Sequence, residues 1–244
     1  MSHPTFAGLD LSALAGATLA FDLDGTLVDT APDLVGTLNV ILQEEGHAPL
    51  PLEDGRPFIG RGARFLLQRG FSAAGAPIAD EAMPALFERF IARYNAHIAD
   101  ESRPFEGVVE TLEALAAAGS RLVVCTNKRT DLSTNLLDAL GMSGHFAAIV
   151  GADQAPAQKP DRRHLETAIA RAGGAVDRAL MVGDAAPDAG AARNAGVPLV
   201  LVSFGYTEIP VADLAPDELI HSYLDLPAAA LRLLTACPAR NDAL

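Results

Sequence analysis

Residues 18–29, Thr18-Leu19-Ala20-Phe21-Asp22-Leu23-Asp24-Gly25-Thr26-Leu27-Val28-Asp29, join a short apolar run to two closely spaced aspartates. The continuous apolar residues at the start of this stretch predict a buried strand. Because side chains alternate along an extended chain, Asp22 and Asp24 point to the same side where the strand ends. Gly25 permits the sharp turn that follows. The stretch therefore predicts a pair of carboxylates at the end of a strand.

Strands and helices are expected to alternate through the rest of the chain. Apolar runs like the first one predict further strands at residues 121–125, 147–150, 179–182 and 197–202. Amphipathic patterns predict helices at residues 108–118, 131–140 and 164–172, and they are followed by Gly119, Gly141 and Gly173, where a left-handed residue ends a helix. Such alternation predicts an α/β fold with a doubly wound, mostly parallel sheet.

Residues 27–104 interrupt this alternation, and no strand is expected among them. They contain three helical patterns, at residues 32–45, 62–69 and 80–98. Roughly eighty residues are far too many for a loop inside a compact domain. We therefore predict an inserted all-helical domain of residues 28–104. The catalytic core would comprise residues 1–27 and 105–244, and residues 104–107 would form the return hinge.

The composition excludes several classes of partner. The chain of 244 residues carries 31 acidic and 18 basic residues, a formal charge of −13. A nucleic-acid binder or a protein of anionic membrane surfaces needs a basic face, and no apolar run reaches the roughly 18 residues of a spanning helix. Of the two cysteines, Cys125 lies inside a predicted strand, which indicates a reducing compartment. The sequence therefore predicts a cytoplasmic protein that binds neither nucleic acid nor membrane.

The spacing of Asp22 and Asp24 has a chemical consequence. Two like charges this close repel each other, so they need a cation, or one of them must hold a proton. Both solutions suit phosphoryl transfer. An ionised aspartate can attack phosphorus and form an aspartyl-phosphate, while a neighbouring protonated carboxyl can donate to the leaving oxygen and later accept a proton from water.

A second acidic pair follows a later apolar run, in Gly183-Asp184-Ala185-Ala186-Pro187-Asp188. In a parallel sheet the carboxyl ends of the strands share one edge, where ligands bind. Asp184 is therefore expected to meet Asp22 there. Oxygen ligands without a cluster of His or Cys favour Mg²⁺. A metal ion would also reverse the negative local charge that would otherwise repel a phosphate.

Possible phosphate donors follow two other apolar runs. Thr126 and Asn127 come at a strand end before a predicted helix, where a hydroxyl and backbone N–H groups can hold an anion. Lys159-Pro160 precedes the helix expected near Arg163, and lysine supplies a compact positive charge for phosphate. Taken alone, Thr126 fits a helix cap better than a phosphate ligand, and Lys159 fits an ordinary surface lysine.

The motifs together resemble those of the haloacid dehalogenase superfamily. They occur in the order Asp22-x-Asp24-Gly25-Thr26, Thr126-Asn127, Lys159-Pro160 and Gly183-Asp184-x-x-x-Asp188. The helical insert resembles the C1-type cap of that superfamily. Residues 19–206 are most similar to the bacterial phosphoglycolate phosphatases, through the stretches Thr126-Asn127-Lys128, Gly151-Ala152-Asp153, Lys159-Pro160-Asp161 and Phe204-Gly205-Tyr206. Arg162 and Ala185 depart from the proline and serine that are common in those enzymes.

The resemblance implies a role for each motif residue. Asp22 would be the nucleophile and also a Mg²⁺ ligand. Asp24 would be the general acid and base, and its backbone carbonyl would bind Mg²⁺. The phosphate group would be bound by Thr126, Asn127 and Lys159. Asp184 would be the principal further metal ligand. Asp188 and Gly183 would support the site, and Asp188 could serve only to orient Lys159.

The helical insert contains a basic loop that could recognise a substrate. Gly60-Arg61-Gly62, with Arg56 and Arg64 nearby, could face a substrate carboxylate, which arginine binds in a bidentate manner. The alternative is a solvated helix start. The stripe of Phe87, Phe90, Ile91 and Tyr94 is expected to serve packing alone, and the six histidines lack metal-ligand spacing, so no role is assigned to them.

These expectations combine into one function with several alternatives. We expect a Mg²⁺-dependent phosphatase for small phosphorylated acids, with 2-phosphoglycolate as substrate. The alternatives are a phosphatase for a sugar-acid phosphate or pyrophosphate, a sugar-phosphate mutase, a haloacid dehalogenase, and a binding protein without catalytic activity. No insert residue that would steer a second hydroxyl is identified, which disfavours the mutase. The oligomeric state, monomer or homodimer, stays open.

Overall fold

The computed structural model describes residue 6 and residues 8–235. Its main sheet has the strand order β5-β4-β1-β6-β7-β8, and every pairing in it is parallel. The strands are β1 Thr18–Phe21, β4 Arg121–Cys125, β5 Ala148–Val150, β6 Ala179–Gly183, β7 Leu199–Val202 and β8 Glu218–Ile220. The chain runs outward from β1 to β5, then crosses back to β6 on the other side. The predicted doubly wound sheet is thus confirmed, with its switch point beside β1.

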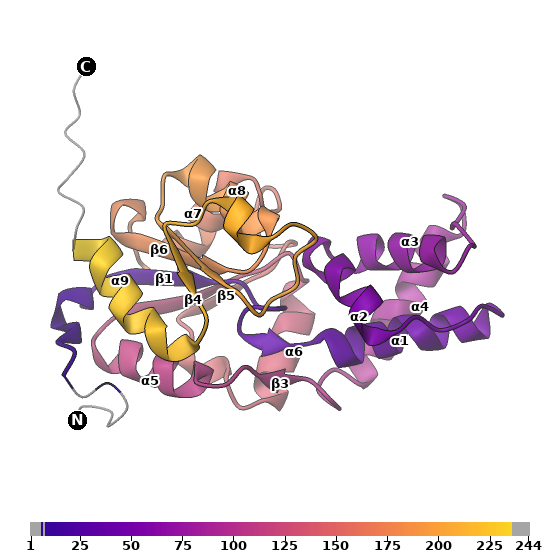
Figure 1. The fold of residues 1–244 in the computed structure, drawn as a ribbon, viewed down its shortest axis with the longest axis horizontal. Helices are drawn as coiled ribbons and strands as arrows, with labels where there is room; N and C mark the ends of the chain where they lie inside the picture. The colour runs from indigo at the N-terminus through magenta and orange to yellow at the C-terminus, as the bar shows by residue number, and fades with distance from the viewer. Residues whose placement is uncertain (1–5, 7, 236–244) are drawn as a thin grey trace, which may run out of the picture.

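Helices cover both faces of this sheet (Figure 1). They are α5 Val108–Ala117, α6 Thr130–Ala139, α7 Arg162–Arg171, α8 Ala186–Ala195 and α9 Leu226–Thr235. The alternating side chains of β1 feed two cores: Leu19 and Phe21 pack with α5, α6 and α9, whereas Ala20 packs with α7 and α8. Burial on both faces explains why the strands appear in the sequence as continuous apolar runs.

The insert forms a group of helices at one end of the molecule (Figure 1). Its elements are α1 Ala31–Glu44, α2 Leu52–Gly55, the 3₁₀ helix η3 Arg56–Arg61, α3 Ala63–Ala73 and α4 Met83–Ala96. The predicted apolar stripes meet here, since Leu38 of α1 is fully buried together with Phe90 of α4. Gly70 lets α3 approach α1, because a Cβ on it would lie 2.5 Å from Leu38 Cδ2.

The expectation of no strand in residues 27–104 is wrong. β2 (Val28–Asp29) pairs antiparallel with β3 (Arg103–Pro104), so the two chain segments that connect the insert to the core are joined to each other. Asp33 strengthens this junction by accepting hydrogen bonds from the Ser102 N–H and hydroxyl, at 2.8 and 2.6 Å. Strands of two residues are too short to leave a periodic pattern in a sequence.

Several elements lie outside the sequence expectations, namely β8, α2, η3, α8 and α9. The small residues of α8 (APDAGAARNA) give only a weak amphipathic pattern, and β8 is a three-residue edge strand. Gly119, Gly141 and Gly173 do have positive φ angles, of 84°, 70° and 71°, as expected after helix ends. Within the described residues, no helix combines the length and hydrophobicity that crossing a membrane requires.

Candidate active site

The predicted site residues come together at the carboxyl edge of the parallel sheet. Asp22, Thr126 and Asp184 each follow one of the adjacent strands β1, β4 and β6. The hydrogen bonds of the sheet continue to Asp22 and Thr126. The Asp22 N–H donates to the carbonyl of Val182 at 2.9 Å, and the Thr126 N–H donates to the carbonyl of Val150 at 3.1 Å. Three strands therefore present these side chains side by side.

A buried lysine connects two of the aspartates. Lys159 Nζ lies 2.6 Å from Asp188 Oδ1 and 2.9 Å from Asp22 Oδ1, and the side chains of Lys159 and Asp188 are inaccessible to solvent. The other oxygen of Asp188 accepts from the N–H groups of Asp184 and Ala185, both at 3.1 Å. Asp188 thus uses both carboxylate oxygens to hold its neighbours.

The buried aspartates carry more negative charge than their surroundings balance. Burial raises the pKa of Asp22 to about 7, although the Lys159 ammonium opposes this shift. Burial, followed by the nearby Asp188 carboxylate, raises the pKa of Asp184 well above its ordinary value. Burial alone would lower the pKa of Lys159, but Asp188 and Asp22 raise it, so the ammonium stays charged. The arrangement is therefore suited to a further cation.

The donor set fits Mg²⁺. Asp22, Asp184 and Asp188 offer carboxylate oxygens that all lie within 4.8 Å of one another. Asp184 is oriented by hydrogen bonds from Thr26 Oγ1 at 2.8 Å and from the Tyr206 N–H at 2.6 Å, as metal-binding carboxylates commonly are. Oxygen donors of this kind are the ligands of hard divalent cations. Asp22, Asp184 and Asp188 are therefore the described side chains that could hold the ion, and Asp188 is in addition paired with the Lys159 ammonium.

Two glycines allow these acidic side chains to approach the backbone. A Cβ on Gly205 would overlap Cβ of Asp184, and a Cβ on Gly183 would overlap the Asp188 side chain. Gly183 was expected to support the site, and this contact supplies the physical reason. Gly205 was noted in the sequence only as part of a family motif.

Asp24 lies on the insert side of this cluster and has its own cation. Lys128 Nζ is 2.8 Å from Asp24 Oδ1 and 3.2 Å from Oδ2, and Thr30 Oγ1 donates to Oδ1 at 2.8 Å. Burial alone would lower the pKa of Lys128, but the Asp24 carboxylate raises it above its ordinary value. The Asp24 carboxylate and its ammonium partner thus form a mostly buried pair.

Asn127 lies in a position different from the one expected of a phosphate ligand. Its Nδ2 donates to the Lys159 carbonyl at 3.1 Å, and its Oδ1 accepts from the Lys159 N–H at 3.0 Å. The side-chain amide is therefore occupied with the main chain of Lys159. The Thr126 hydroxyl is buried and accepts from the Lys128 N–H at 3.2 Å, which leaves its proton available to another acceptor.

The sequence offered no role for His164, yet it is a fully buried neighbour of Lys159. Its Nδ1 accepts from the Lys159 N–H, and its Nε2 faces the Val150 carbonyl, both at 3.2 Å. An N–H donor on one side and a carbonyl on the other define the neutral tautomer with its proton on Nε2. Burial, together with the Lys159 ammonium, lowers the pKa of His164 to about 4.

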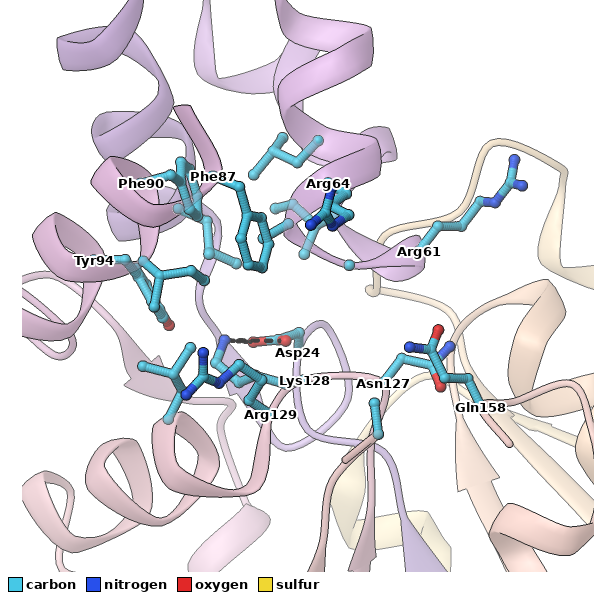
Figure 2. Close-up of a pocket in the computed structure, with 18 residues that line it drawn as sticks. Asp24, Arg61, Arg64, Phe87, Phe90, Tyr94, Asn127, Lys128, Arg129 and Gln158 are labelled. Atoms are coloured by element: carbon cyan, nitrogen blue, oxygen red, sulfur yellow. Dashed lines mark hydrogen bonds and ion pairs between the residues drawn. The ribbon is translucent and has the colours of Figure 1, made fainter. Parts of the chain in front are cut away.

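A cavity of about 220 Å³ opens between the insert and the sheet edge beside Asp24 (Figure 2). Its cationic lining consists of Arg61, Arg64, Lys128 and Arg129, against the single carboxylate of Asp24. The local charge is thus opposite in sign to the −13 of the whole chain. A small cavity with this lining suits a small anionic ligand.

The basic residues of the insert have different positions. Arg61 and Gly62 line the cavity, but the Arg61 guanidinium lies 4.1 Å from the Phe65 ring centroid and points away from Asp24 (Figure 2). Arg56 lies outside the cavity lining and makes a bidentate contact with Asp29, at 3.2 and 3.3 Å. Arg56 is therefore occupied with the hinge carboxylate in this structure, and the contact does not support the predicted role at the substrate.

The aromatic stripe of α4 serves more than the packing expected of it. Phe87, Phe90, Ile91 and Tyr94 all line the cavity, and Phe90 and Tyr94 are also buried in the core. The Tyr94 ring centroid is 4.5 Å from Lys128 Nζ. Cys125, in contrast, behaves as a core residue as expected, since burial raises the pKa of its thiol to about 12.

Comparisons with known proteins agree with this architecture. The sequence model of the haloacid dehalogenase-like hydrolase family matches residues 19–202. A phosphoglycolate phosphatase of Caulobacter vibrioides is 63% identical over 234 residues, 96% of this chain and 99% of that protein. One from Agrobacterium fabrum is 45% identical over 216 residues, covering 88% and 93%. A crystal structure described as a predicted phosphoglycolate phosphatase from Haemophilus somnus has a TM-score of 0.82 and 30% identity, covering 91% and 99%. The chain therefore belongs to the haloacid dehalogenase-like hydrolase family.

Proposed function

We propose that this protein is a Mg²⁺-dependent phosphatase that hydrolyses 2-phosphoglycolate to glycolate and phosphate. The observation that carries the proposal is the position of Asp22, which lies 2.9 Å from the Lys159 ammonium and shares a buried acidic cluster with Asp184. A cavity with four cationic side chains begins beside Asp24. The substrate is suggested by the name of the relatives that share 63% and 45% identity with this chain.

The first chemical step would transfer the phosphoryl group to Asp22. One of its carboxylate oxygens attacks phosphorus in line, and the bond between phosphorus and the ester oxygen breaks. Asp24, which enters this step protonated, gives its proton to the departing oxygen. The Lys159 ammonium, held by Asp188 at 2.6 Å, compensates negative charge on the phosphoryl oxygens. The Thr126 hydroxyl adds a donor at the same strand edge.

The second step would release phosphate and restore the enzyme. Asp24 accepts a proton from water, and the water oxygen attacks the phosphorus of the aspartyl-phosphate while the bond from phosphorus to Asp22 breaks. When bound by Asp22, Asp184 and the carbonyl of Asp24, Mg²⁺ supplies positive charge that offsets the anionic oxygens. The Lys128 ion pair and the Thr30 hydroxyl keep the Asp24 carboxylate in place.

We further propose that residues 28–104 form the cap over a core of residues 1–27 and 105–244. The cavity is lined by both parts, for example by Phe87 and Arg64 from the insert and by Asn127 from the core. The paired segments β2 and β3 would act as the hinge. Closure of such a cap excludes bulk water and selects small substrates.

The cationic lining of the cavity supports a small phosphate ester as the partner, and the charge of −13 argues against nucleic acid and anionic membranes. A mostly buried free thiol at Cys125 supports a reducing, cytoplasmic location.

The test is a screen of phosphorylated metabolites for kcat/KM with the purified protein and Mg²⁺. We expect 2-phosphoglycolate to give the highest value, and chelation by EDTA to abolish turnover until Mg²⁺ is restored. A clear preference for a sugar phosphate or pyrophosphate would replace the proposed substrate. Turnover that ignores chelation would reject the metal-dependent mechanism and point to a dehalogenase.

A further inference from the structure

Lysine is rare in this chain, and its positions are informative. The sequence contains sixteen arginines but only two lysines, Lys128 and Lys159. Both ammonium groups lie at the candidate active site, one bound to Asp24 and the other to Asp22 and Asp188. Both side chains are nearly or fully buried, with exposures of 6% and 0%. Lys159 belongs to the phosphate end of the site, which leaves the leaving-group end to Lys128.

Tyr94 provides a second feature at the same end. Its side chain is 1% exposed, and its hydroxyl oxygen interacts with the Lys128 ammonium. An ammonium can only donate, so the hydroxyl proton has no acceptor in the described part of the chain. The hydroxyl end of Tyr94 is directed toward Lys128 and Asp24 (Figure 2), and the ring centroid is 4.5 Å from Lys128 Nζ. A buried hydroxyl proton without an acceptor is costly, so an acceptor oxygen delivered by a ligand would be stabilised there.

Covalent geometry determines which substrate group could reach this place. The ester oxygen must come within about 2.7 Å of the Asp24 carboxyl to receive its proton, and Lys128 Nζ lies 2.8 Å from that carboxyl. In a 2-phospho acid, a carboxylate oxygen is three bonds from the ester oxygen, which corresponds to about 3 Å. These distances allow an anionic group on the adjacent carbon to come within hydrogen-bonding range of Lys128.

The other cations of the cavity are less suited to this role. Arg129 is 45% exposed and pairs with Asp131 at 2.8 Å. Arg61 lies over Phe65 and points away from Asp24, and the Arg64 guanidinium lies 4.6 Å from the Phe87 ring centroid. Lys128 is the cation of the cavity that contacts Asp24 directly.

We propose that Lys128 of the core and Tyr94 of the insert together form the subsite that binds the carboxylate of a 2-phospho acid. This inference rests on the proposed phosphatase function and assigns its substrate selectivity to two residues. The Lys128 ammonium donates to one carboxylate oxygen while it keeps its contact with Asp24. The Tyr94 hydroxyl donates to the same carboxylate, and because Tyr94 belongs to α4, the subsite is complete only when the insert lies over the core.

The experiment measures kcat/KM for 2-phosphoglycolate and for 2-phosphoglycolamide. The second compound keeps the phosphate but has a neutral amide in place of the carboxylate. The preference for the acid over the amide should fall about 10- to 100-fold in Lys128→Met and several-fold in Tyr94→Phe, as expected for lost charge-assisted and neutral hydrogen bonds. Arg93→Met is the matched control, because it removes a cation from α4 outside the cavity lining and should leave the preference unchanged.

The outcomes separate this subsite from other roles. Equal losses on the acid and the amide would show that Lys128 only positions Asp24, and would overturn the proposal. Loss of the preference in Arg64→Met, with retention in Lys128→Met, would move the subsite to Arg64 and overturn it as well. A wild-type protein that releases phosphate from neither compound would reject the proposed function itself. Tyr94→Phe keeps the ion pair of Asp24 and so tests the subsite even if Lys128→Met folds poorly.

Binding can be followed without turnover. Protein labelled with ¹³C at the lysine Cε should give two lysine signals, because the chain has two lysines. Added glycolate should shift mainly the Lys128 signal, and inorganic phosphate mainly the Lys159 signal, with Lys128→Arg identifying the first. A glycolate titration that leaves the Lys128 signal unmoved would contradict the subsite.

Discussion

The side-chain amide of Asn127 pairs with the main chain of Lys159 through both of its polar atoms, at 3.1 and 3.0 Å. These hydrogen bonds connect the end of β4 to the segment before α7, which are 32 residues apart in the sequence. They hold the backbone from which the Lys159 ammonium reaches Asp22 and Asp188. We interpret Asn127 as a positioning residue for that ammonium.

Asn127→Ala is therefore expected to lower kcat/KM by about 10- to 100-fold, because a displaced ammonium compensates the phosphoryl charge less well. The affinity for inorganic phosphate should fall as well. Steady-state kinetics and phosphate titration measure both effects. Gln43→Ala removes an exposed side chain on α1 and serves as the control. Unchanged phosphate affinity in Asn127→Ala would show that Lys159 needs no such support.

Asp22→Asn should lower kcat by at least about 10³-fold, because an amide oxygen cannot form the aspartyl-phosphate. The fold should survive, since Asn has nearly the same shape and Lys159 keeps its 2.6 Å contact with Asp188. Without metal, the variant should be at least as stable as the wild type, because burial already disfavours the Asp22 charge. Phosphate release and urea unfolding measure the two effects. Undiminished turnover would remove Asp22 as the nucleophile.

Mg²⁺ should stabilise the wild-type protein against unfolding, because it binds a carboxylate cluster that exists only in the folded state. At a concentration of 100 times Kd the gain is about 2.7 kcal/mol. Asp184→Asn should lose most of this gain, since Asp184 belongs to the cluster of three carboxylates that could hold the ion and lacks the lysine partner of the other two. Thermal unfolding over a series of Mg²⁺ concentrations measures the effect. Equal stabilisation of both proteins would locate the ion elsewhere.

Parts of this site could be predicted from sequence for clear physical reasons. Asp22 and Asp184 follow strands that are buried on both faces, and such strands appear as continuous apolar runs whose carboxyl ends share one edge. The contacts of His164 and Tyr94 could not be predicted. Tyr94 meets Lys128 only in the folded chain, and His164 contacts Lys159 across a turn whose geometry the sequence pattern does not specify. A histidine and an aromatic stripe on amphipathic helices look the same in sequence whether they only pack or also touch Lys159 and Lys128.

Other differences have equally specific causes. Arg56 was expected at the substrate because of its charge. Its contact with Asp29 at 3.2 Å joins residues 27 positions apart, which a local sequence pattern cannot reveal. The strands β2 and β3 were missed because two residues cannot show a periodicity. The composition does single out Lys128, since the chain has only two lysines and uses arginine for its other basic residues.

His164 predicts a pH dependence of stability. Its pKa is about 4 in the folded protein and about 6.5 in an unfolded chain, so the folded state binds fewer protons between these values. Its contribution is complete above pH 6.5 and is lost as the pH falls toward 4, by about 3 kcal/mol at most. Protonation would place a donor on Nδ1 against the Lys159 N–H, which is 3.2 Å away.

The comparison with His164→Asn isolates this effect. Asn retains an acceptor near Nδ1 but does not titrate. The raised pKa values of Asp22 and Asp184 make the free energy of unfolding increase toward acid, opposite to the effect of His164, and they do so equally in both proteins. The free energy of unfolding in urea, measured from pH 4.5 to 7.5, should therefore decrease more steeply toward acid in the wild type. Parallel curves would mean that His164 is not kept neutral by its surroundings.

Gly205 should tolerate no side chain, because a Cβ there would overlap Cβ of Asp184. Gly205→Ala is expected to destabilise the protein by about 1–3 kcal/mol and to displace Asp184 from the Tyr206 N–H that orients it at 2.6 Å. The affinity for Mg²⁺ should fall together with the stability. Gly144→Ala is the matched control, since no atom lies within 4 Å of its Cβ. If Gly205→Ala bound Mg²⁺ as tightly as Gly144→Ala, the packing of this glycine would have no part in orienting the metal ligand.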